Sequence, residues 1–426
     1  CAAQAIVRPA STDEVAAVLR LCHEAGQPVV PCGGNTGLVL GTHAPQNEIQ
    51  LSTERMTQIE NVDTAGCTMT VQSGAPLQSI QEAADADDLY FPLDFPARGT
   101  ATIGGAISTN AGGNSVIRYG MTREQVLGLE VVLADGTVMS SLNNMLKNNA
   151  GYDLKQLFIG TEGTLGIVTR AVLRLRAALK SQNTALVAVD EYDKVSVLLR
   201  HLGATLGGTL NAFEVLWADF DNLLLDSSDK HAAPLEQKFP FYVLIESRGG
   251  DQDADNERFV HSLEAALGKG LIVDAAIASD SRQRDAMWAI RDDIQGLAAA
   301  LYPIIAFDIS VPISDANTYV EGVRRKLHER WPETGRNVTF GHLGDSNIHF
   351  VMTIGNHDPE QVGEAMKIVY SELAPFGGSV SAEHGIGLEK KPFLGITRSE
   401  IEIGLMRQLK SVLDPKGILN PGKVVS

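Results

Sequence analysis

The segment GHLGDSNIHF, residues 341–350, places two of the ten histidines of the chain seven positions apart. On one continuous strand, an odd offset would point the two imidazole rings to opposite faces. The residues GDSN at 344–347 are typical of a turn, so we predict a hairpin in which His342 directly faces His349. Directly opposed residues have Cβ atoms about 4.5–5.5 Å apart, and the two rings would therefore converge on one ion.

A carboxylate and a third histidine, Glu383 and His384, follow in GGSVSAEHGIGLEKK. Two histidines and one carboxylate with an open coordination position compose a catalytic Zn²⁺ site, and Mn²⁺ or Fe²⁺ would accept the same ligands. A histidine pair across a hairpin is also a common polar surface feature. The residues by themselves leave both interpretations open.

Two glycine-rich loops lie in the first half of the chain. PCGGNTGLVLG at 31–41 and TATIGGAISTNAGGNSVIRYG at 100–120 could each turn several backbone N–H groups toward one point. Two such loops in one domain favour a cofactor that contains a pyrophosphate. Neither loop matches GxGxxG or GxxxxGK[ST], which argues against nicotinamide or nucleoside triphosphate binding by those routes.

Length and charge limit the remaining classes. A chain of 426 residues is too long for one ordinary core, and its formal charge of -17 argues against nucleic acid as a partner. Its longest uncharged stretch, residues 99–117, contains five glycines and several polar side chains, so we predict a loop system and no transmembrane segment. The four cysteines, all within the first 67 residues, lack CxxC spacing, which is typical of thiols in a reducing cytosol; we expect a cytoplasmic protein.

The sequence changes character near residue 176. Glycine-rich turns and short β-branched runs precede this point, and alternating strands and amphipathic helices follow it. We predict an α+β fold with helices that cover one face of an antiparallel sheet, with domains at 1–176, 177–385 and 386–426. Near the end, we expect an apolar helical stripe to pack in the core; it comprises Leu405, Met406, Leu409, Val412 and Leu413.

Two long motifs carry a family resemblance. PLDFPARGTATIGGAISTNAGGNSVIRYGMTREQVLGLEVVLADGT and NNAGYDLKQLFIGTEGTLGIVTRAVLRL resemble the FAD-binding domain of the vanillyl-alcohol oxidase/p-cresol methylhydroxylase superfamily. The branch that the chain resembles, over nearly its whole length, is that of the D-2-hydroxyacid dehydrogenases. The resemblance implies a two-part FAD-binding domain, a cap domain with an antiparallel sheet covered by helices, and a C-terminal segment that returns to the FAD domain.

The resemblance also implies the residues that hold FAD. Residues 33–38 and 104–113 would wrap the pyrophosphate, and Asn420 would reach the flavin from the C-terminal segment. The adenine and ribose would be lined by Gly163, Gly166, Ile167 and Val168. Asn35 stands where some members attach FAD covalently through a histidine, so we expect non-covalent FAD. The predicted FAD contacts are Gly33, Gly34, Asn35, Thr36, Gly37, Leu38, Pro92, Thr102, Ile103, Gly104, Gly105, Ser108, Thr109, Asn110, Gly112, Gly113, Glu162, Gly163, Gly166, Ile167, Val168 and Asn420.

In the same family, the HxGDxNxH motif and the glutamate of EHG bind a metal. Carried over by position, His342, His349 and Glu383 become the ligands, and His384 becomes the catalytic base. Arg291, in MWAIRDDI, matches the arginine that binds the substrate carboxylate; without the resemblance it could equally be a surface helix arginine. The implied reaction converts a 2-hydroxyacid to its 2-oxo acid, with a hydride passing to the flavin.

Three positions depart from relatives that act on D-2-hydroxyglutarate. Those relatives usually carry a lysine where Ala306 stands in IIAFDISVP, an amide at the position of Val351, and a different polar residue at Gln295. The changes remove groups that could bind a second carboxylate. We therefore expect D-lactate or another small monocarboxylate as the substrate, with D-2-hydroxyglutarate as the alternative.

Other functions stay open on sequence grounds. An FAD reductase that takes electrons from NADPH would have no need for the two histidines and the glutamate. A non-catalytic flavoprotein subunit of a multisubunit oxidase is the alternative from another class. The electron acceptor leaves no motif and could be an electron-transfer flavoprotein, a quinone or a cytochrome. The resemblance also suggests a homodimer.

Overall fold

The computed structural model describes residues 2–227 and 230–425; for residues 226 and 227 only the backbone is described. Within these residues the chain forms two compact units. Unit 1 is assembled from Cys1–Ser115, Tyr119–Ala178 and Glu383–Ser426, and unit 2 from Val116–Arg118 and Leu179–Ala382. Segments at both ends of the chain therefore build one unit, and the middle of the chain builds the other.

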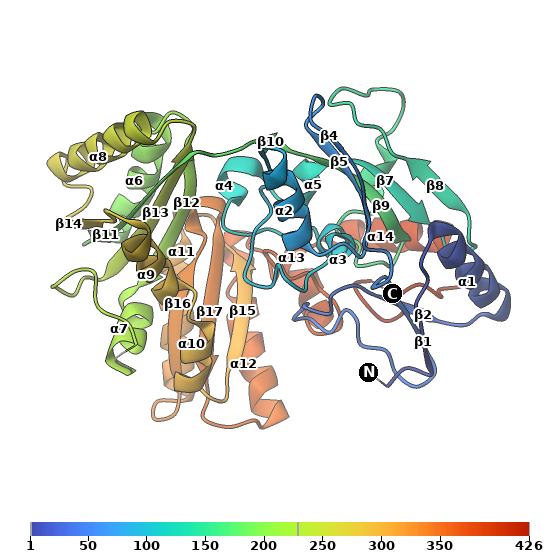
Figure 1. Ribbon diagram of the computed structural model, residues 1–426. Helices are drawn as coiled ribbons and strands as arrows, with labels where there is room; N and C mark the ends of the chain where they lie inside the picture. Colours follow the sequence, from blue (N-terminus) through green and yellow to red (C-terminus); the bar gives the residue numbers. More distant parts are fainter. Residues whose placement is uncertain (1, 228–229, 426) are drawn as a thin grey trace. The chain divides into compact units, whose positions relative to one another are not determined.

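Unit 1 contains a small parallel sheet of order β1-β3-β2, an antiparallel sheet of order β4-β5-β9-β7-β8 and a two-stranded ladder of β10 and β6 (Figure 1). Its strands are β1 Ala5–Val7, β2 Val29–Cys32, β3 Ile49–Ser52, β4 Ile59–Asp63, β5 Thr68–Gln72, β6 Leu89–Tyr90, β7 Val126–Val132, β8 Val138–Ser141, β9 Ile167–Arg174 and β10 Arg176–Ala177. Its helices are α1 Thr12–Ala25, α2 Leu77–Ala86, α3 Ile103–Thr109, α5 Thr122–Gln125, α13 Leu394–Thr397 and α14 Glu400–Leu413; α4, Val116–Tyr119, has residues of both units.

The C-terminal segment completes the core of unit 1. Leu419 forms a parallel bridge with Val29 in β2, and it is fully buried in a cluster with Leu19 of α1 and Leu51 of β3. Burial of a leucine side chain contributes about 1.5–3 kcal/mol. The last residues of the chain thereby help to hold the parallel sheet that carries the first glycine-rich loop.

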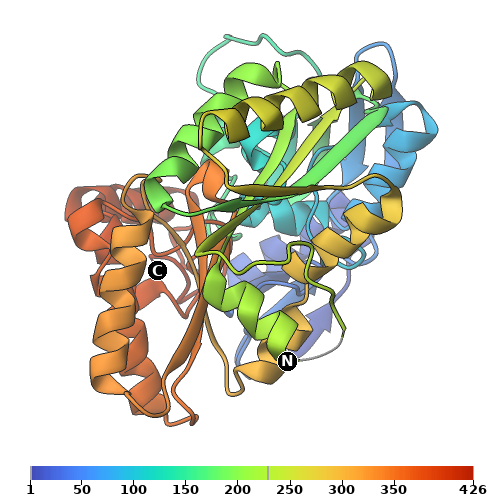
Figure 2. The same ribbon diagram turned by 90° about the vertical axis from the view of Figure 1, so that its left-hand side faces the viewer.

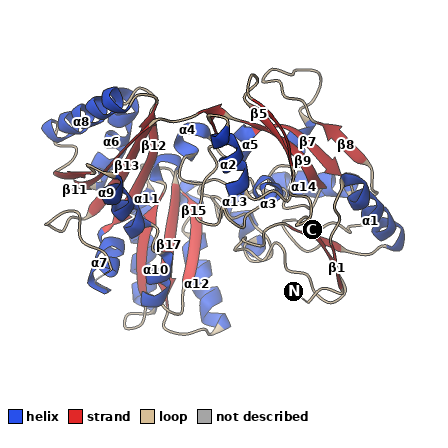
Figure 3. Cartoon of the chain, in the orientation of Figure 1, coloured by secondary structure: helices blue, strands red, loops and turns tan. Residues whose placement is uncertain are grey.

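Unit 2 is built on one seven-stranded sheet of order β14-β11-β13-β12-β16-β17-β15, in which neighbouring strands are antiparallel (Figure 3). The strands are β11 Ser181–Val189, β12 Leu210–Trp217, β13 Phe241–Gly249, β14 Asp274–Ile277, β15 Ile305–Ser310, β16 Arg336–Gly341 and β17 Asn347–Thr353. The helices are α6 Tyr192–Thr205, α7 Ala218–Ser227, α8 Gln252–Gly268, α9 Ser281–Arg291, α10 Ile294–Ala300, α11 Ala316–Arg330 and α12 Pro359–Ser371.

Helices cover both faces of this sheet, which corrects the prediction that they cover one face. Leu186 and Leu244 point to the face that packs against α7, α9 and α10. On the opposite face, Phe307 packs against Tyr370 of α12, and Figure 2 shows orange strands between orange helices and the green and gold helices. The strands are apolar at successive positions, as strands buried on both faces require. The apolar spacing of each helix shows that one of its sides is buried, but it does not show which face of the sheet that side covers.

The hairpin of β16 and β17 exists, but its register differs from the prediction. Phe340, not His342, pairs with His349, because the turn starts one residue earlier: a 3₁₀ turn, Leu343–Asp345, ends at Ser346 with φ 74°. A shift of the turn by one residue moves the pairing by two residues. Since the side-chain period of a strand is two, His342 still lies on the same face as His349, at a diagonal position.

The apolar stripe on α14 does not pack as predicted. Leu405 is 55% exposed and Val412 is 76% exposed, whereas Ile403 and Lys410 are buried. The helix turns its opposite side inward because the Lys410 ammonium donates to the carbonyl oxygens of Thr164 and Leu419 and to Asp414. Of the predicted stripe, Leu413 packs against the core of unit 1.

Two composition-based expectations concern the described residues. None of their helices is long and apolar enough to cross a membrane. Cys22, Cys32 and Cys67 are free thiols, and Cys1 lies outside the described residues. The expected cytoplasmic location stays a prediction.

Candidate active site

Four of the functional side chains of unit 2 share one face of its sheet. Leu216 of β12 pairs with Phe340 of β16, and Phe340 pairs with His349 of β17. Glu214 lies two residues from Leu216 in β12 and therefore points to the same face. His342 directly follows the last residue of β16, and its contact with Glu214 brings its ring to that face. Helix α9 covers this face and contributes Arg291 at its last residue.

The two histidines come together as the sequence predicted, although their register is different. Their ring centroids lie 5.2 Å apart with the planes at 83°, and His342 is buried. Glu383 directly follows the last residue of unit 2, and ligand atoms of Glu383, His342 and His349 lie within 4.8 Å of one another. Two imidazoles and a carboxylate at such distances are a donor set that suits a divalent transition metal.

Arg291 is not a surface arginine. It is 5% exposed, and its Nε donates to Glu214 Oε2 at 2.9 Å. Its Nη2 lies 3.1 Å from His342 Nε2, and its guanidinium lies 5.1 Å from the ring centroid of Phe340. The predicted carboxylate-binding group therefore lies beside the predicted metal ligand His342.

Glu214 joins these two residues, and the sequence analysis did not select it. It is 1% exposed in a strand whose eight residues are all buried. Its Oε1 lies 2.6 Å from His342 Nδ1, and its Oε2 accepts from Arg291. Burial raises the pKa of Glu214, but the hydrogen bonds of His342 and Arg291 and the charge of Arg291 outweigh burial and hold the pKa below its usual range. The available signal was one carboxylate in an apolar strand, LNAFEVLW.

The hydrogen-bond partners determine which nitrogen of His342 carries a proton. A guanidinium is a donor only, so His342 Nε2, 3.1 Å from Arg291 Nη2, must present its lone pair. The proton of the neutral ring then lies on Nδ1, which donates to Glu214. A metal-ligating histidine usually donates its other ring N–H to a carboxylate, as His342 does here; a metal on Nε2 would replace the contact with Arg291.

Asp308 is a further acidic group that the sequence analysis did not select. It is 1% exposed in β15, pairs with His349 across the ladder and accepts from Asn347 Nδ2 at 2.8 Å. Ligand atoms of Asp308, Glu383 and His384 also lie within 4.8 Å of one another. The predicted base, His384, thus has a carboxylate neighbour in addition to Glu383.

In unit 1, the two glycine-rich loops pack directly against each other. A Cβ on Gly34 would lie 2.0 Å from the carbonyl oxygen of Thr100, and one on Gly33 would lie 2.3 Å from Thr102 Oγ1. Residues with a side chain cannot approach so closely, so glycine is required at both positions. The approach places the backbone of the first loop against the start of α3, where Thr102 Oγ1 accepts from the N–H of Gly105.

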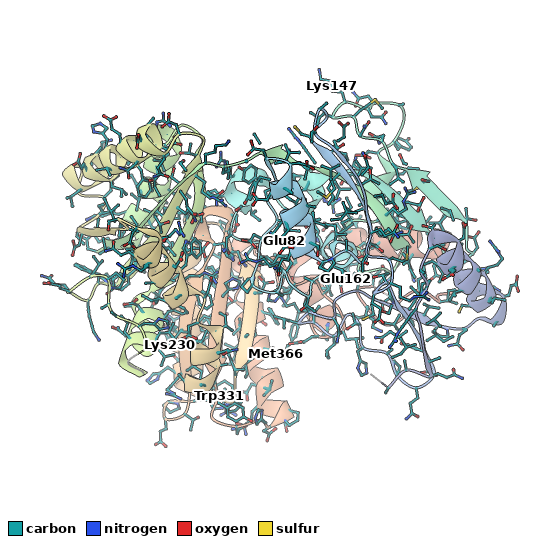
Figure 4. The ribbon with its side chains drawn as sticks, in the orientation of Figure 1. Glu82, Lys147, Glu162, Lys230, Trp331 and Met366 are labelled. Atoms are coloured by element: carbon teal, nitrogen blue, oxygen red, sulfur yellow. The ribbon has the colours of Figure 1, made fainter. Side chains whose placement is uncertain are left out.

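Glu162 and Asn420 bring the other two predicted segments to these loops. The N–H of Glu162, labelled in Figure 4, donates to the carbonyl oxygen of Ser108 at 2.8 Å. The Asn420 side-chain amide donates to the carbonyl oxygens of Glu162 and Gly41, at 2.7 and 3.2 Å. The Glu162 carboxylate itself accepts from the N–H groups of Ile386 and Gly387 and so anchors the segment that follows His384.

Several of the predicted polar contacts form hydrogen bonds within the loops. Ser108 and Thr109 donate to the carbonyl oxygens of Gly104 and Gly105, and Asn35 accepts from Thr42. Asn110 accepts from the N–H of Arg123. These side chains shape the loops, and their roles toward FAD stay predictions.

The remaining predicted contacts divide by exposure. Thr36, Gly37 and Leu38 are exposed on the first loop, whereas Gly112 and Gly113 are buried in the second. The others pack inside unit 1: Pro92, Ile103, Gly163, Gly166, Ile167 and Val168. The residues fit a dinucleotide, because two glycine loops meet there and the buried Asn420 Oδ1 has no hydrogen-bond partner among the described residues.

Comparison with known proteins supports the same interpretation. A family model described as FAD linked oxidases, C-terminal domain, matches residues 178–424. A second, described as FAD binding domain, matches residues 3–141. Among solved structures, p-cresol methylhydroxylase with substrate bound gives a TM-score of 0.77 at 16% identity, over 99% of this chain and 88% of that one. An alkyldihydroxyacetonephosphate synthase gives 0.75 at 20% identity, over 98% and 76%; both show the fold alone.

Sequence relatives cover almost the whole chain. The mitochondrial D-2-hydroxyglutarate dehydrogenase of Rattus norvegicus is 38% identical over 99% of this chain and 78% of its own length. The D-2-hydroxyglutarate dehydrogenase of Xanthomonas citri pv. viticola is 39% identical over 99% and 89%. A protein of Schizosaccharomyces pombe, provisionally named a mitochondrial D-lactate dehydrogenase, is 35% identical over 99% and 82%. The chain belongs to the FAD-linked oxidases and, among them, to the FAD-dependent D-2-hydroxyacid dehydrogenases.

Proposed function

We propose that this protein oxidises D-lactate, or a similarly small D-2-hydroxy monocarboxylate, to the 2-oxo acid with the help of a divalent metal. The observation that carries the metal requirement is the set of His342, His349 and Glu383 ligand atoms within 4.8 Å of one another. The observation that carries the substrate class is the buried Arg291 beside His342.

Each residue has a role in this proposal. His342 would bind the metal through Nε2, with His349 and Glu383 as the other ligands. Arg291 would pair with the substrate carboxylate through Nη2, which would leave His342 Nε2 once a metal took that lone pair, while its Nε stays bound to Glu214. His384 would take the proton of the C2 hydroxyl as general base. A bound metal supplies a lower pKa for that hydroxyl, and bound FAD supplies the acceptor for the C2 hydride.

The preference for a monocarboxylate rests on two apolar residues. Ala306 of β15 pairs with Val351 of β17, one period along the ladder from the pair of Asp308 and His349. The two alternate positions therefore share the face of the proposed metal ligands. Gln295, the third position of interest, is exposed on α10. Two small apolar side chains offer no partner for a distal carboxylate.

A second candidate substrate is D-2-hydroxyglutarate. It is favoured by the names of relatives at 38% and 39% identity that span 99% of this chain. Arg291 would serve either substrate, so the two candidates differ in how the distal end is bound. Zn²⁺ is the proposed metal, and Mn²⁺ and Fe²⁺ would accept the same ligands.

Anaerobic flavin reduction tests the proposal. The FAD-loaded protein is mixed with D-lactate, L-lactate, D-2-hydroxybutyrate and D-2-hydroxyglutarate, and the flavin absorbance is followed with and without a chelator. We expect the D-monocarboxylates to give the highest kcat/KM, and we expect chelation to abolish reduction until metal is restored. Chelator-insensitive reduction would remove the metal from the mechanism, and a higher kcat/KM for D-2-hydroxyglutarate would establish the second candidate.

A further inference from the structure

One buried carboxylate, Glu214, contacts both a proposed metal ligand and the proposed substrate arginine. Its two oxygens are divided between them, with Oε1 at 2.6 Å from His342 Nδ1 and Oε2 at 2.9 Å from Arg291 Nε. All three residues belong to unit 2 and are at most 6% exposed. An ionised carboxylate at such burial is costly unless it is paired and hydrogen-bonded, and Glu214 has both kinds of partner.

Each contact determines a property that the reaction needs. The contact with Nδ1 holds the His342 proton on that nitrogen, because Arg291 Nη2 faces Nε2 and can only donate. The contact with Nε fixes one edge of the guanidinium, whose Nη2 lies 3.1 Å from His342 Nε2. A metal held by Nε2 would release Nη2 to a substrate carboxylate. An amide has one acceptor oxygen and one N–H₂ group, so Glu214→Gln could keep at most one of the two contacts, and that contact would lose the charge of the carboxylate.

We propose that Glu214 is a positioning residue that couples metal binding at His342 to substrate carboxylate binding at Arg291. This inference rests on the proposed function for the identity of the two ligands. The carboxylate itself touches neither ligand in this scheme. It acts through the imidazole proton and the guanidinium orientation, so its loss should weaken both kinds of binding together.

The test compares Glu214→Gln with Glu246→Gln. Glu246 is a suitable control because it is also buried in the same sheet, and it binds the neutral groups of Gln182, Asn211 and Trp288. Metal-free protein is titrated with Zn²⁺ and Mn²⁺ against a chromophoric chelator. We expect Glu214→Gln to weaken metal binding by about 10- to 100-fold, as loss of a carboxylate behind a ligating histidine does, and Glu246→Gln to bind like the wild type.

Two further measurements separate positioning from general damage. At saturating metal, the KM for D-lactate should rise in Glu214→Gln and stay unchanged in Glu246→Gln. In ¹⁵N-histidine spectra of the metal-free protein, the Nδ1–H proton resonance of His342 should move upfield in Glu214→Gln only, because an amide oxygen is a weaker acceptor than a carboxylate. Glu214→Asp retains the charge with a shorter side chain and should give intermediate values, which keeps the test available if the amide variant folds poorly.

The outcomes distinguish the inference from the function on which it rests. Equal metal affinity and an unchanged Nδ1–H resonance of His342 in Glu214→Gln would overturn the inference and leave the proposed function intact. Wild-type protein that takes up no metal would overturn the proposed metal centre, and the coupling with it. In that case the Nδ1–H resonance would still show whether Glu214 accepts the hydrogen bond of the His342 ring.

Discussion

At the scale of single residues, Ala306 offers a direct test of substrate selection. The residue is exposed in β15 and shares the face of His349, so a longer side chain fits there. Ala306→Lys should raise kcat/KM for D-2-hydroxyglutarate by about 10- to 100-fold, because a hydrogen bond to a charged group contributes about 1.5–3 kcal/mol. Steady-state kinetics on D-2-hydroxyglutarate and D-lactate provide the measurement.

The control for this change is Ala306→Met, which adds length without charge. It should leave D-2-hydroxyglutarate activity near the wild-type value. If lysine and methionine changed the activity equally, shape and not charge would select the substrate, and the argument from the missing lysine would be wrong.

Sequence reasoning at this scale succeeded where residue type and spacing coincide. His342 and His349 are recognisable because a turn-forming segment separates them, and the structure brings their rings together. Glu214 was not recognisable, since its partners Arg291 and His342 are distant in sequence, and only the pairing of β12 with β16 brings them to one place. A buried ion pair between distant strands leaves no local pattern.

At the scale of elements, α14 shows how an apolar pattern can be assigned to the wrong side of a helix. The predicted stripe, which includes Leu405 and Val412, has more apolar residues than the side of the helix that is buried, which includes Ile403. Apolar periodicity therefore favoured the stripe. What periodicity omits is the buried Lys410 ammonium, which three oxygen acceptors satisfy. The β16–β17 hairpin is a second case in which a local pattern was not sufficient. Its turn starts one residue earlier than predicted, and the register of the two strands changes with it.

The orientation of α14 predicts unequal effects of substitution on its two sides. Leu405→Gln should change the free energy of unfolding of unit 1 by less than about 0.5 kcal/mol, because exposed positions tolerate polar residues. Ile403→Ala should lower it by about 2–4 kcal/mol, because it removes buried apolar atoms. Urea unfolding followed by circular dichroism and FAD release measures both. A large loss in Leu405→Gln, or a change of oligomeric state, would indicate that another chain covers the stripe.

At the scale of the whole molecule, unit 1 is built from segments that lie on both sides of unit 2 in the sequence. Residues 383–426 belong to unit 1 although unit 2 precedes them in sequence, and Leu419 is buried against β2 near the start of the chain. Local patterns predicted a helix near the end of the chain. They hold no information about which distant strand the segment after this helix joins, and only the family resemblance indicated a return to the FAD domain.

This connectivity predicts that a change at the last residues affects FAD binding and leaves unit 2 intact. Leu419→Ala should destabilise unit 1 by about 2–5 kcal/mol, since it leaves a cavity at a fully buried position. FAD release on heating reports on unit 1. All three tryptophans, Trp217, Trp288 and Trp331, belong to unit 2, so their fluorescence reports on unit 2 alone.

We expect Leu419→Ala to lower the temperature of FAD release and to leave the tryptophan transition in place. Leu198→Ala, at an equally buried leucine of α6 in unit 2, is the matched control and should give the reverse pattern. Equal shifts of both signals in each variant would mean that the units unfold as one cooperative system. The C-terminal segment would then stabilise the whole chain, because a loss of packing beside β2 would be shared by the sheet of unit 2.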